Sequence, residues 1–275
     1  MFTSDLIRLA LEEDSGSGDI TSDAVVPKTL AGRGVILAKQ DLVLAGLGVA
    51  FGVFLSIDPT TKIRKLAWDG DSVPAGTRVA EIAGFYRNLL RGERVALNFL
   101  QRLCGVATLT RSFVLRTEGT KTKILDTRKT TPLVRHLEKY AVRMGGGSNH
   151  RFGLSDAVLI KDNHIAACKG DVAEAVRKMK KKCGKKPITV EVTRVEEVEP
   201  AIGAGATRLL LDNMADPQVE CAVALARGRV EIEVSGGITR ERVARLSKIG
   251  VDYISVGALT HSAPAADLSF EVLPS

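Results

Sequence analysis

The chain has 275 residues, of which 45% are hydrophobic and 26% are charged, and it carries a formal net charge of +7. These values are typical of a folded globular protein with one large or two smaller domains, and they exclude a disordered, collagen-like or coiled-coil chain. Aromatic residues make up only 4% of the chain, which leaves few candidates for stacking on nucleic-acid bases. The positive charge therefore predicts either a surface for a polyanion or a pocket that gathers phosphates and carboxylates.

The N-terminal part mixes helix and strand patterns. Residues 1–13 predict a short amphipathic helix without the basic and apolar regions of a targeting signal. The apolar stretch 42–57 is shorter than a membrane span and contains glycines, so we expect a buried strand and a helix there. A long helical pattern follows over 92–117, and we expect Gly105 to interrupt it. The predicted strands of this part are 32–39, 63–68 and 77–82, with turn residues over 69–76.

The four cysteines lie far apart in the sequence and include no C-x-x-C pair. This spacing argues against a disulfide framework or a structural zinc site. His164 and Cys168 stand four residues apart, but two ligands without further partners are a poor indication of a metal. We therefore expect reduced thiols in a cytoplasmic protein.

From Lys123 onward, short apolar runs alternate with amphipathic helical patterns. Runs that are apolar throughout indicate parallel strands buried on both faces, and so predict a compact α/β barrel or an open sheet. Thr239 precedes the last of these helices and is expected to cap it. The six predicted strands are 124–125, 157–160, 188–192, 209–211, 230–234 and 253–256, and the helices between them are 171–182, 195–204, 217–226 and 239–249.

Polar residues gather where each predicted strand ends. In parallel α/β folds the carboxyl ends of the strands share one rim, and that rim is the usual active-site face. Six polar strand ends in succession therefore predict an enzyme. The six segments are 126–129, 161–164, Glu191, 212–213, 235–237 and 257–262.

The charges on this rim indicate the kind of substrate. Cations there can bind carboxylates and phosphates, while carboxylates can hold Mg²⁺ or face a developing positive charge on a sugar. Glu191 stands in an otherwise apolar strand, where an unpaired carboxylate would be costly. The Ser235–Gly237 turn could cradle a phosphate at the following helix or be a plain strand–helix turn. The rim cations are Arg128, Lys129, His150, Arg151 and Lys161, and the carboxylates are Glu191 and Asp212.

The motifs at these positions resemble the quinolinate phosphoribosyltransferase family, also called carboxylating nicotinate-nucleotide pyrophosphorylase. The resemblance covers nearly the whole chain, and the combined motifs are specific. The motifs are GDIT (18–21), ERVALN (93–98), GVAT (105–108), DTRKTT (126–131), LEKYAV (137–142), GGG (145–147), NHRFG (149–153), LIKDNH (159–164), LDNM (211–214), VSGGI (234–238), GVDYIS (250–255) and LTHS (259–262).

The resemblance implies an α/β protein with an N-terminal α/β sandwich domain, residues 1–117, completed by residues 264–275. It implies that residues 118–263 form an incomplete parallel α/β barrel of about six strands, and that the chain forms a homodimer with active sites at the interface. The implied reaction joins quinolinate to phosphoribosyl pyrophosphate with Mg²⁺, giving nicotinate mononucleotide, pyrophosphate and carbon dioxide in de novo NAD synthesis. No nucleic-acid or membrane partner is implied.

The resemblance also implies a role for each site residue. Lys129 would reach the pyrophosphate, while Glu191 and Asp212 would hold the ribose and magnesium and stabilise charge at the anomeric carbon. The implied quinolinate-binding residues are Arg128, His150, Arg151 and Lys161, with Arg94 contributed by the neighbouring subunit. Thr127 is a further implied substrate-binding residue. The residues implied to bind the 5′-phosphate are Ser235, Gly236, Gly237, Gly257 and His261.

The sequence departs from the family pattern at a few positions. Leu133–Val134 stands where Gly–Leu is expected, Thr189 replaces a Glu, and Cys104 replaces a Ser. None of these changes removes an implied contact residue. They place the local backbone near Arg135 and the charge beside Glu191 in question.

Three alternatives compete with this interpretation. A molybdenum-associated paralogue of the same fold is disfavoured by the intact LIKDNH motif with Lys161. A nicotinate-specific phosphoribosyltransferase would need fewer cations for a monocarboxylate than Arg128, Arg151 and Lys161 provide. A basic nucleic-acid-binding protein is suggested by the Lys-rich segment 177–186, but a solvated helix end explains that segment equally well.

Overall fold

The computed structural model describes residues 3–274, and its two larger sheets belong to two separate compact units. One unit comprises the described residues up to Arg111, residues 130–146 and the residues from His261 onward. The other comprises residues 112–129 and 147–260. The chain therefore passes from the first unit to the second and back twice.

The first unit contains a four-stranded antiparallel sheet with the order β12-β1-β5-β3. Its strand β12 comes from the C-terminal end of the chain and pairs with β1 from Gly32 to Ala38, with Gly34 opposite Val272. Residue burial alternates along β1, as expected for a strand with one face on a core. Its strands are β1 (Ala31–Ala38), β3 (Lys62–Lys65), β5 (Arg78–Phe85) and β12 (Leu268–Pro274), beside a small pair β2 (Leu42–Val43) and β4 (Ser72–Val73).

Helices of this unit include α1 (Thr3–Ser15), α2 (Ile20–Val25), α3 (Leu47–Ile57) and most of α4 (Tyr86–Val114). The last residues of α4, from Ser112, and the short 3-10 helix η1 (Leu115–Thr117) belong to the other unit. The first two residues of the predicted helix 1–13 lie outside the described residues. The predicted strand and helix of 42–57 are confirmed as β2 and α3. Among the residues that the structure describes, no helix is both long enough and apolar enough to cross a membrane.

The prediction that Gly105 interrupts the long helix is wrong, because α4 continues through it. A Cβ atom at this position would lie 2.0 Å from the carbonyl oxygen of Pro264. The glycine therefore permits the C-terminal segment to lie directly on the helix, which outweighs its low helix propensity.

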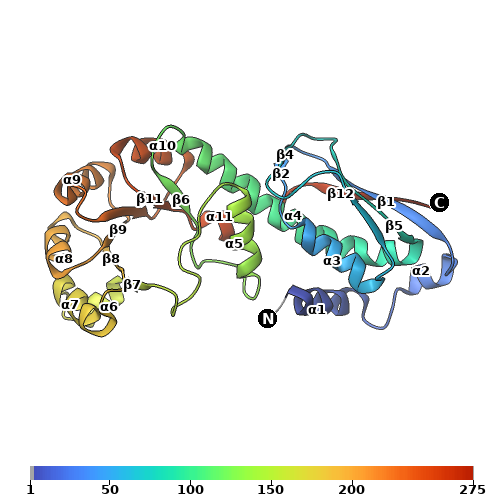
Figure 1. Cartoon of the computed structure of the whole chain (residues 1–275), viewed down its shortest axis with the longest axis horizontal. Coiled ribbons are helices and arrows are strands. Elements are labelled where there is room, and N and C mark those ends of the chain that lie inside the picture. Colours follow the sequence, from blue (N-terminus) through green and yellow to red (C-terminus); the bar gives the residue numbers. More distant parts are fainter. Residues whose placement is uncertain (1–2, 275) are drawn as a thin grey trace. The chain divides into compact units, whose positions relative to one another are not determined.

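The second unit is built on a six-stranded sheet with the order β6-β11-β10-β9-β8-β7, in which all the pairs are parallel (Figure 1). Its edge strands are β6 and β7, so the predicted incomplete parallel barrel is confirmed. The strands are β6 (Lys123–Leu125), β7 (Val158–Ile160), β8 (Ile188–Val192), β9 (Arg208–Asp212), β10 (Glu231–Ser235) and β11 (Tyr253–Ser255).

Helices connect these strands and cover the outer side of the curved sheet (Figure 1). Thr239 caps the helix α10 as predicted, because its hydroxyl accepts a hydrogen bond from Arg242 N. The helical elements are α6 (Asp162–Ala166), α7 (Val172–Cys183), η2 (Val195–Glu197), α8 (Val198–Ala204), α9 (Asp216–Ala226), α10 (Arg240–Ile249) and α11 (Ala258–His261).

The segment 130–146, which the predicted domain limits place in the barrel domain, groups instead with the first unit. Its helix α5 (Arg135–Met144) carries Glu138, which is fully buried and accepts hydrogen bonds from Arg102 Nη2 at 2.7 Å and Thr131 N at 3.0 Å. A Cβ at Gly145 would lie 2.5 Å from Ala107 O, so the end of α5 lies directly against α4. This buried ion pair and close packing bind the segment to α4, which periodicity could not predict.

Leu133 explains why a glycine is expected at its position, since its φ is +69°. The left-handed backbone conformation is strained for a leucine, and because Leu133 is 66% exposed, burial of its side chain does not offset that strain. We expect Leu133→Gly to raise the free energy of unfolding by about 1 kcal/mol, after allowing for the extra flexibility of glycine in the unfolded chain. Denaturant unfolding measures the change.

Leu154→Gly is the matched control for this prediction. Leu154 is 75% exposed but is not among the positive-φ residues, so glycine there relieves no strain and should leave stability unchanged or lower it. Equal effects of the two substitutions would contradict the assignment of strain to Leu133.

Candidate active site

Carboxyl ends of the parallel strands carry most of the predicted site residues. In the strand register, Glu191 of β8, Leu210 of β9 and Glu233 of β10 lie at one level. Asp212 and Ser235 lie opposite each other two residues further on. Because successive side chains alternate between the faces of a strand, these residues share one face of the sheet.

Glu191 and Lys161 form an ion pair at this rim, with 3.8 Å between Glu191 Oε2 and Lys161 Nζ. The Glu191 side chain is 9% exposed, whereas that of Lys161 is 49% exposed. Burial raises the pKa of Glu191, the charge of Lys161 opposes this increase, and the nearby Asp212 adds to it. The structure therefore brings two carboxylates and one cation together from three strand ends.

Asp212 is held by its neighbours at the end of β9. Its Oδ1 accepts a hydrogen bond from Ser235 Oγ at 2.6 Å, and its Oδ2 accepts one from Asn213 Nδ2 at 2.8 Å. Ser235 lies at the end of β10, so it links Asp212 to the glycine turn that follows. The carboxylate thus has a fixed orientation at the rim.

The turn at Gly236 and Gly237 requires glycine. Both residues have positive φ, +89° and +57° respectively, and a Cβ at Gly236 would lie 2.1 Å from Asn213 Oδ1. Arg242 donates to Gly236 O at 2.9 Å, so the turn is tied to α10. A backbone that is open on this side and precedes a helix N-terminus suits an anion.

Following β6, the backbone of Lys129 is fixed by two threonines. Thr127 Oγ1 accepts from Lys129 N at 3.0 Å, and Thr260 Oγ1 donates to Lys129 O at 2.7 Å. Thr260 belongs to the same end of β11 as Gly257, whose carbonyl it also contacts. These contacts place Lys129 at the rim with its side chain exposed.

Arg128 and Arg151 bring two guanidinium groups near each other. Burial lowers the pKa of Arg151, and the charge of Arg128 lowers it further. Arg151 also donates to Ala157 O at 3.0 Å. Repulsion between like charges is unfavourable in the free protein and is relieved when an anion binds between them.

Two buried carboxylates that are not among the predicted site residues, Asp126 and Glu233, support the loop of His150. Asp126 Oδ1 accepts from His150 N at 2.8 Å and its Oδ2 accepts from Asn149 Nδ2 at 2.6 Å. Glu233 Oε1 lies 3.3 Å from His150 Nε2. The signal for Glu233 was available, because an acidic residue inside the buried strand 231–235 is as unusual as Glu191 in β8.

Arg94 and His261 belong to the other compact unit. Arg94 lies on α4 with a side chain that is 57% exposed, and its guanidinium is 3.9 Å from Glu93. His261 ends the helix α11 and its ring contacts Ser262 Oγ. Their roles in the site remain predictions.

A magnesium ion implied by the family would find two carboxylates at the rim, Glu191 and Asp212, which are close enough to raise the pKa of Glu191. Mg²⁺ usually takes one or two carboxylates together with waters and substrate phosphates. The pair therefore fits an ion carried by the donor pyrophosphate. In the part of the chain that the structure describes, no group of three metal-binding side chains occurs.

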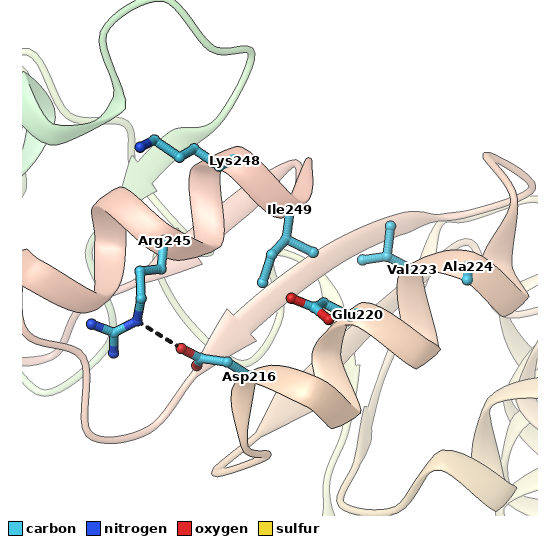
Figure 2. A pocket seen from close by; sticks show the side chains of 7 residues that line it. All are labelled: Asp216, Glu220, Val223, Ala224, Arg245, Lys248 and Ile249. Atoms are coloured by element: carbon cyan, nitrogen blue, oxygen red, sulfur yellow. Dashed lines mark hydrogen bonds and ion pairs between the residues drawn. The ribbon is translucent and has the colours of Figure 1, made fainter.

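A groove lies elsewhere, between α9 and α10 on the outer side of the sheet (Figure 2). Asp216 in this groove accepts hydrogen bonds from Arg242 and Arg245, each at 2.9 Å. Its acidic group is therefore engaged in ion pairs away from the rim, and the groove adds no residue to the candidate site.

Comparisons with known proteins identify the family of this chain. The family model for the quinolinate phosphoribosyl transferase N-terminal domain matches residues 19–104, and the model for the C-terminal domain matches residues 106–271. The chain belongs to the quinolinate phosphoribosyltransferase family. It is therefore related to phosphoribosyltransferase enzymes, and the alternative interpretations find no support.

Relatives of this family align along nearly the whole chain. A probable nicotinate-nucleotide pyrophosphorylase (carboxylating) of Bacillus subtilis (strain 168) is 43% identical over 94% of this chain and 90% of its own length. The chloroplastic nicotinate-nucleotide pyrophosphorylase (carboxylating) of Arabidopsis thaliana is 39% identical over 97% of this chain and 82% of its own length. The crystal structure of NadC from Streptococcus pyogenes matches with a TM-score of 0.95 and 42% identity over 98% of this chain and 96% of that one.

Proposed function

We propose that this chain is a quinolinate phosphoribosyltransferase of de novo NAD biosynthesis. It transfers the phosphoribosyl group of phosphoribosyl pyrophosphate to quinolinate and releases pyrophosphate and carbon dioxide, leaving nicotinate mononucleotide. The observation that carries the proposal is the 43% identity with a carboxylating nicotinate-nucleotide pyrophosphorylase over 94% of the chain.

Quinolinate, a dicarboxylate, would bind at the cationic side of the rim. Arg128 and Arg151 are close enough for their charges to repel, and an arginine can bind a carboxylate through two parallel hydrogen bonds. Lys161, at the end of β7, adds a third cation, and His150 lies beside Arg151. Two carboxylates would therefore meet several positive groups at once.

Phosphoribosyl pyrophosphate would bind along the neighbouring strand ends. The backbone of Ser235, Gly236 and Gly237 before α10 suits its 5′-phosphate, with Gly257 and His261 assigned to the same phosphate by the family pattern. Lys129 would reach the pyrophosphate, with Thr127 ordering its backbone. Glu191 and Asp212 would hold the ribose and a donor-bound Mg²⁺, which would neutralise charge on the pyrophosphate.

The reaction follows from where charge develops. The pyridine nitrogen attacks the anomeric carbon as pyrophosphate leaves, and positive charge builds on the sugar. Glu191 and Asp212 face that charge from β8 and β9 and stabilise it. The ring nitrogen then becomes cationic and can accept the electron pair left at C2 when the adjacent carboxylate departs, so decarboxylation follows formation of the glycosidic bond.

The experiment that tests this proposal measures products from purified protein with phosphoribosyl pyrophosphate and Mg²⁺. We expect quinolinate to give nicotinate mononucleotide and carbon dioxide, and nicotinic acid to be a poor substitute because it brings only one carboxylate to the cations. Failure to convert quinolinate, or equal turnover of nicotinic acid, would reject the proposal.

We also propose that the chain works in the cytoplasm as a homodimer in which Arg94 completes the quinolinate site of the partner copy. Its exposed side chain on α4 is available for such a contact. Mixing Arg94→Ala protein with Lys161→Ala protein should restore activity, because mixed dimers would contain one intact site. Activity that stays at the level of the separate variants would show that Arg94 does not act in trans.

A further inference from the structure

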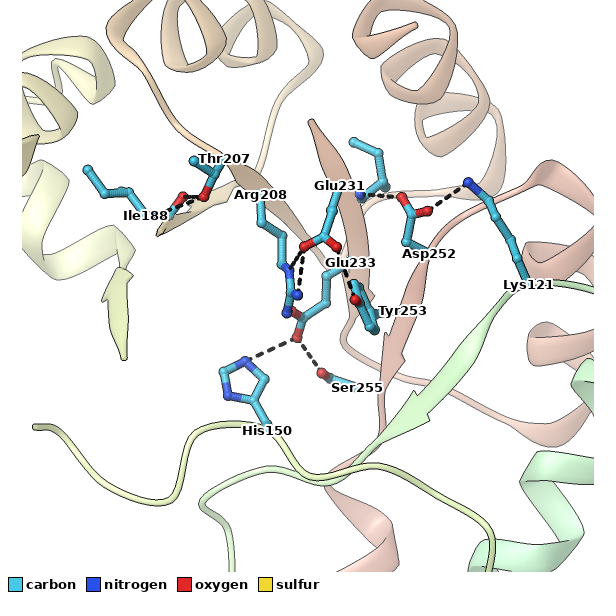
Figure 3. Close-up of polar contacts among 11 residues, drawn as sticks. Lys121, His150, Ile188, Thr207, Arg208, Glu231, Glu233, Asp252, Tyr253 and Ser255 are labelled. Carbon is cyan, nitrogen blue, oxygen red and sulfur yellow. Dashed lines mark hydrogen bonds and ion pairs between the residues drawn. The ribbon is translucent and has the colours of Figure 1, made fainter. Parts of the chain in front are cut away.

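His150 has both ring nitrogens engaged. Its Nδ1 accepts a hydrogen bond from the backbone N–H of Arg151 at 2.7 Å. Its Nε2 lies 3.3 Å from Glu233 Oε1, and Figure 3 shows this contact between the ring and the carboxylate. A ring nitrogen that accepts an N–H must carry a lone pair, so Nδ1 bears no proton in this arrangement. The ring hydrogen is then on Nε2 and points to the carboxylate of Glu233.

Glu233 is fixed by groups from both neighbouring strands. It is fully buried in β10, accepts a hydrogen bond from Ser255 Oγ of β11, and its Oε2 lies 3.3 Å from Arg208 Nη1 of β9. Burial raises the pKa of Glu233, but the hydrogen bonds from His150 and Ser255 and the charge of Arg208 outweigh it and hold the pKa below its usual range. The carboxylate is therefore an ionised acceptor with one orientation.

Charges of both signs surround the imidazole. Glu233 faces Nε2, and Asp126 accepts the backbone N–H of His150 at 2.8 Å. Arg151 follows in the chain beside Arg128, and Arg208 lies behind Glu233. The N–H of Arg151 occupies the position that a proton on Nδ1 would need, so the geometry leaves that nitrogen as an acceptor.

We propose that Glu233 is a positioning residue for quinolinate binding, which holds His150 as the neutral Nε2–H tautomer. Nδ1 of that tautomer in turn fixes the backbone of Arg151. His150 is then a rigid bridge from β10 to Arg151, and the positive charge for the dicarboxylate comes from Arg128, Arg151 and Lys161. This inference rests on the proposed function for the identity of the ligand, while the tautomer rests on geometry alone.

The tautomer is tested on the wild-type protein by NMR with ¹⁵N-labelled histidine. The chain has four histidines, so the His150 signals can be assigned by their loss in His150→Gln. At neutral pH we expect one protonated ring nitrogen and one lone-pair nitrogen, with the proton on Nε2. Two protonated nitrogens, or a proton on Nδ1, would overturn the proposal.

Kinetics test the positioning role. Glu233→Leu removes the acceptor and should raise KM for quinolinate about tenfold, while KM for phosphoribosyl pyrophosphate changes by less than about twofold. Glu233→Gln keeps an amide oxygen that can accept from Nε2–H, so it should recover most of the affinity for quinolinate and leave the tautomer unchanged. A merely structural role would move both KM values together.

Glu231→Gln is the matched control. Glu231 lies two residues earlier on β10 and binds Arg208 at 2.7 Å and Tyr253 OH at 3.0 Å, as Figure 3 shows. The Glu231→Gln substitution weakens an ion pair of Arg208, the same arginine that binds Glu233. An unchanged KM for quinolinate in this variant therefore supports a specific path through His150. An increase in KM equal to that of Glu233→Leu would contradict that path.

The outcomes separate this inference from the proposed function. A wild-type protein that does not convert quinolinate rejects the function, and the NMR measurement still judges the tautomer. A wild-type protein that converts quinolinate but contains His150 as an imidazolium rejects the inference alone. If Glu233→Leu does not fold, Glu233→Gln and the wild-type spectrum still decide the outcome.

Discussion

Glu191→Gln is expected to lower kcat by about a hundredfold to a thousandfold, because it removes one negative group facing the charge that develops on the sugar. The substitution keeps the size and the position of the side chain in β8. Initial rates at saturating quinolinate and phosphoribosyl pyrophosphate measure the effect. Glu220→Gln, an exposed acid on α9, is the control with the same chemical change, and its kcat should match the wild type.

The same variant should be at least as stable as the wild type at neutral pH. Burial raises the pKa of Glu191, so the folded protein binds this proton more tightly than the unfolded chain does, and stability falls as pH rises from the unfolded pKa through the folded pKa. Glutamine does not ionise, so the variant does not lose stability in this way as the pH rises. The Tm advantage of Glu191→Gln should be absent in acid, appear across this window and stay constant above it.

An activity loss accompanied by a large fall in Tm would mean that Glu191 is required for folding, and the catalytic interpretation would then lose its basis. The ion pair with Lys161 is the reason to make this check. Because Lys161 is half-exposed, water can replace much of that interaction.

Arg128→Ala is expected to weaken quinolinate binding by about a hundredfold, as two charge-assisted hydrogen bonds to one carboxylate would be lost. Affinity for phosphoribosyl pyrophosphate should change little, since that substrate is assigned to the neighbouring strand ends. Titration calorimetry with each ligand measures the two affinities separately. The substitution also removes a charge that repels Arg151.

Arg177→Ala is the control for this experiment. Arg177 is 56% exposed on α7, in the Lys-rich segment, and its ion pairs are with Asp171 and Glu174. It changes the net charge by the same amount, so unchanged quinolinate affinity would show that position, not total charge, matters. If Arg128→Ala altered only donor binding, the assignment of the quinolinate pocket would be wrong.

Local patterns were sufficient for most elements of the fold. Apolar runs separated by helical periodicity predicted all six parallel strands of the second unit, because strands buried on both faces need continuous apolar sequence. The start of α10 was predictable from Thr239, because an N-cap hydrogen bond involves only residues of the first helical turn. Local rules failed at Gly105, where contact with Pro264, distant in sequence, decided the structure.

The site, like the fold, has features that local sequence predicts and features that depend on contacts between distant segments. Polar residues at strand ends are visible in sequence, since the shared rim follows from parallel pairing. Thr189 illustrates the limit of the sequence, because its place in the family pattern raised the question of which charges lie beside Glu191. In the structure, Arg208 is opposite Thr189 in the strand register and binds Glu231 and Glu233. Which acids pair with which cations depends on distances that the sequence does not contain.

By itself, the sequence determined the α/β class, the six parallel strands, the family and the set of charged residues at the rim. These follow from periodicity, from motifs and from the rule that parallel strands end on one side. The tertiary structure decided that residues 130–146 belong with α4, and that Glu233, not selected from sequence, faces His150. Burial and pairing of such groups depend on contacts between segments far apart in the chain, and the energy of a buried charge depends on those contacts.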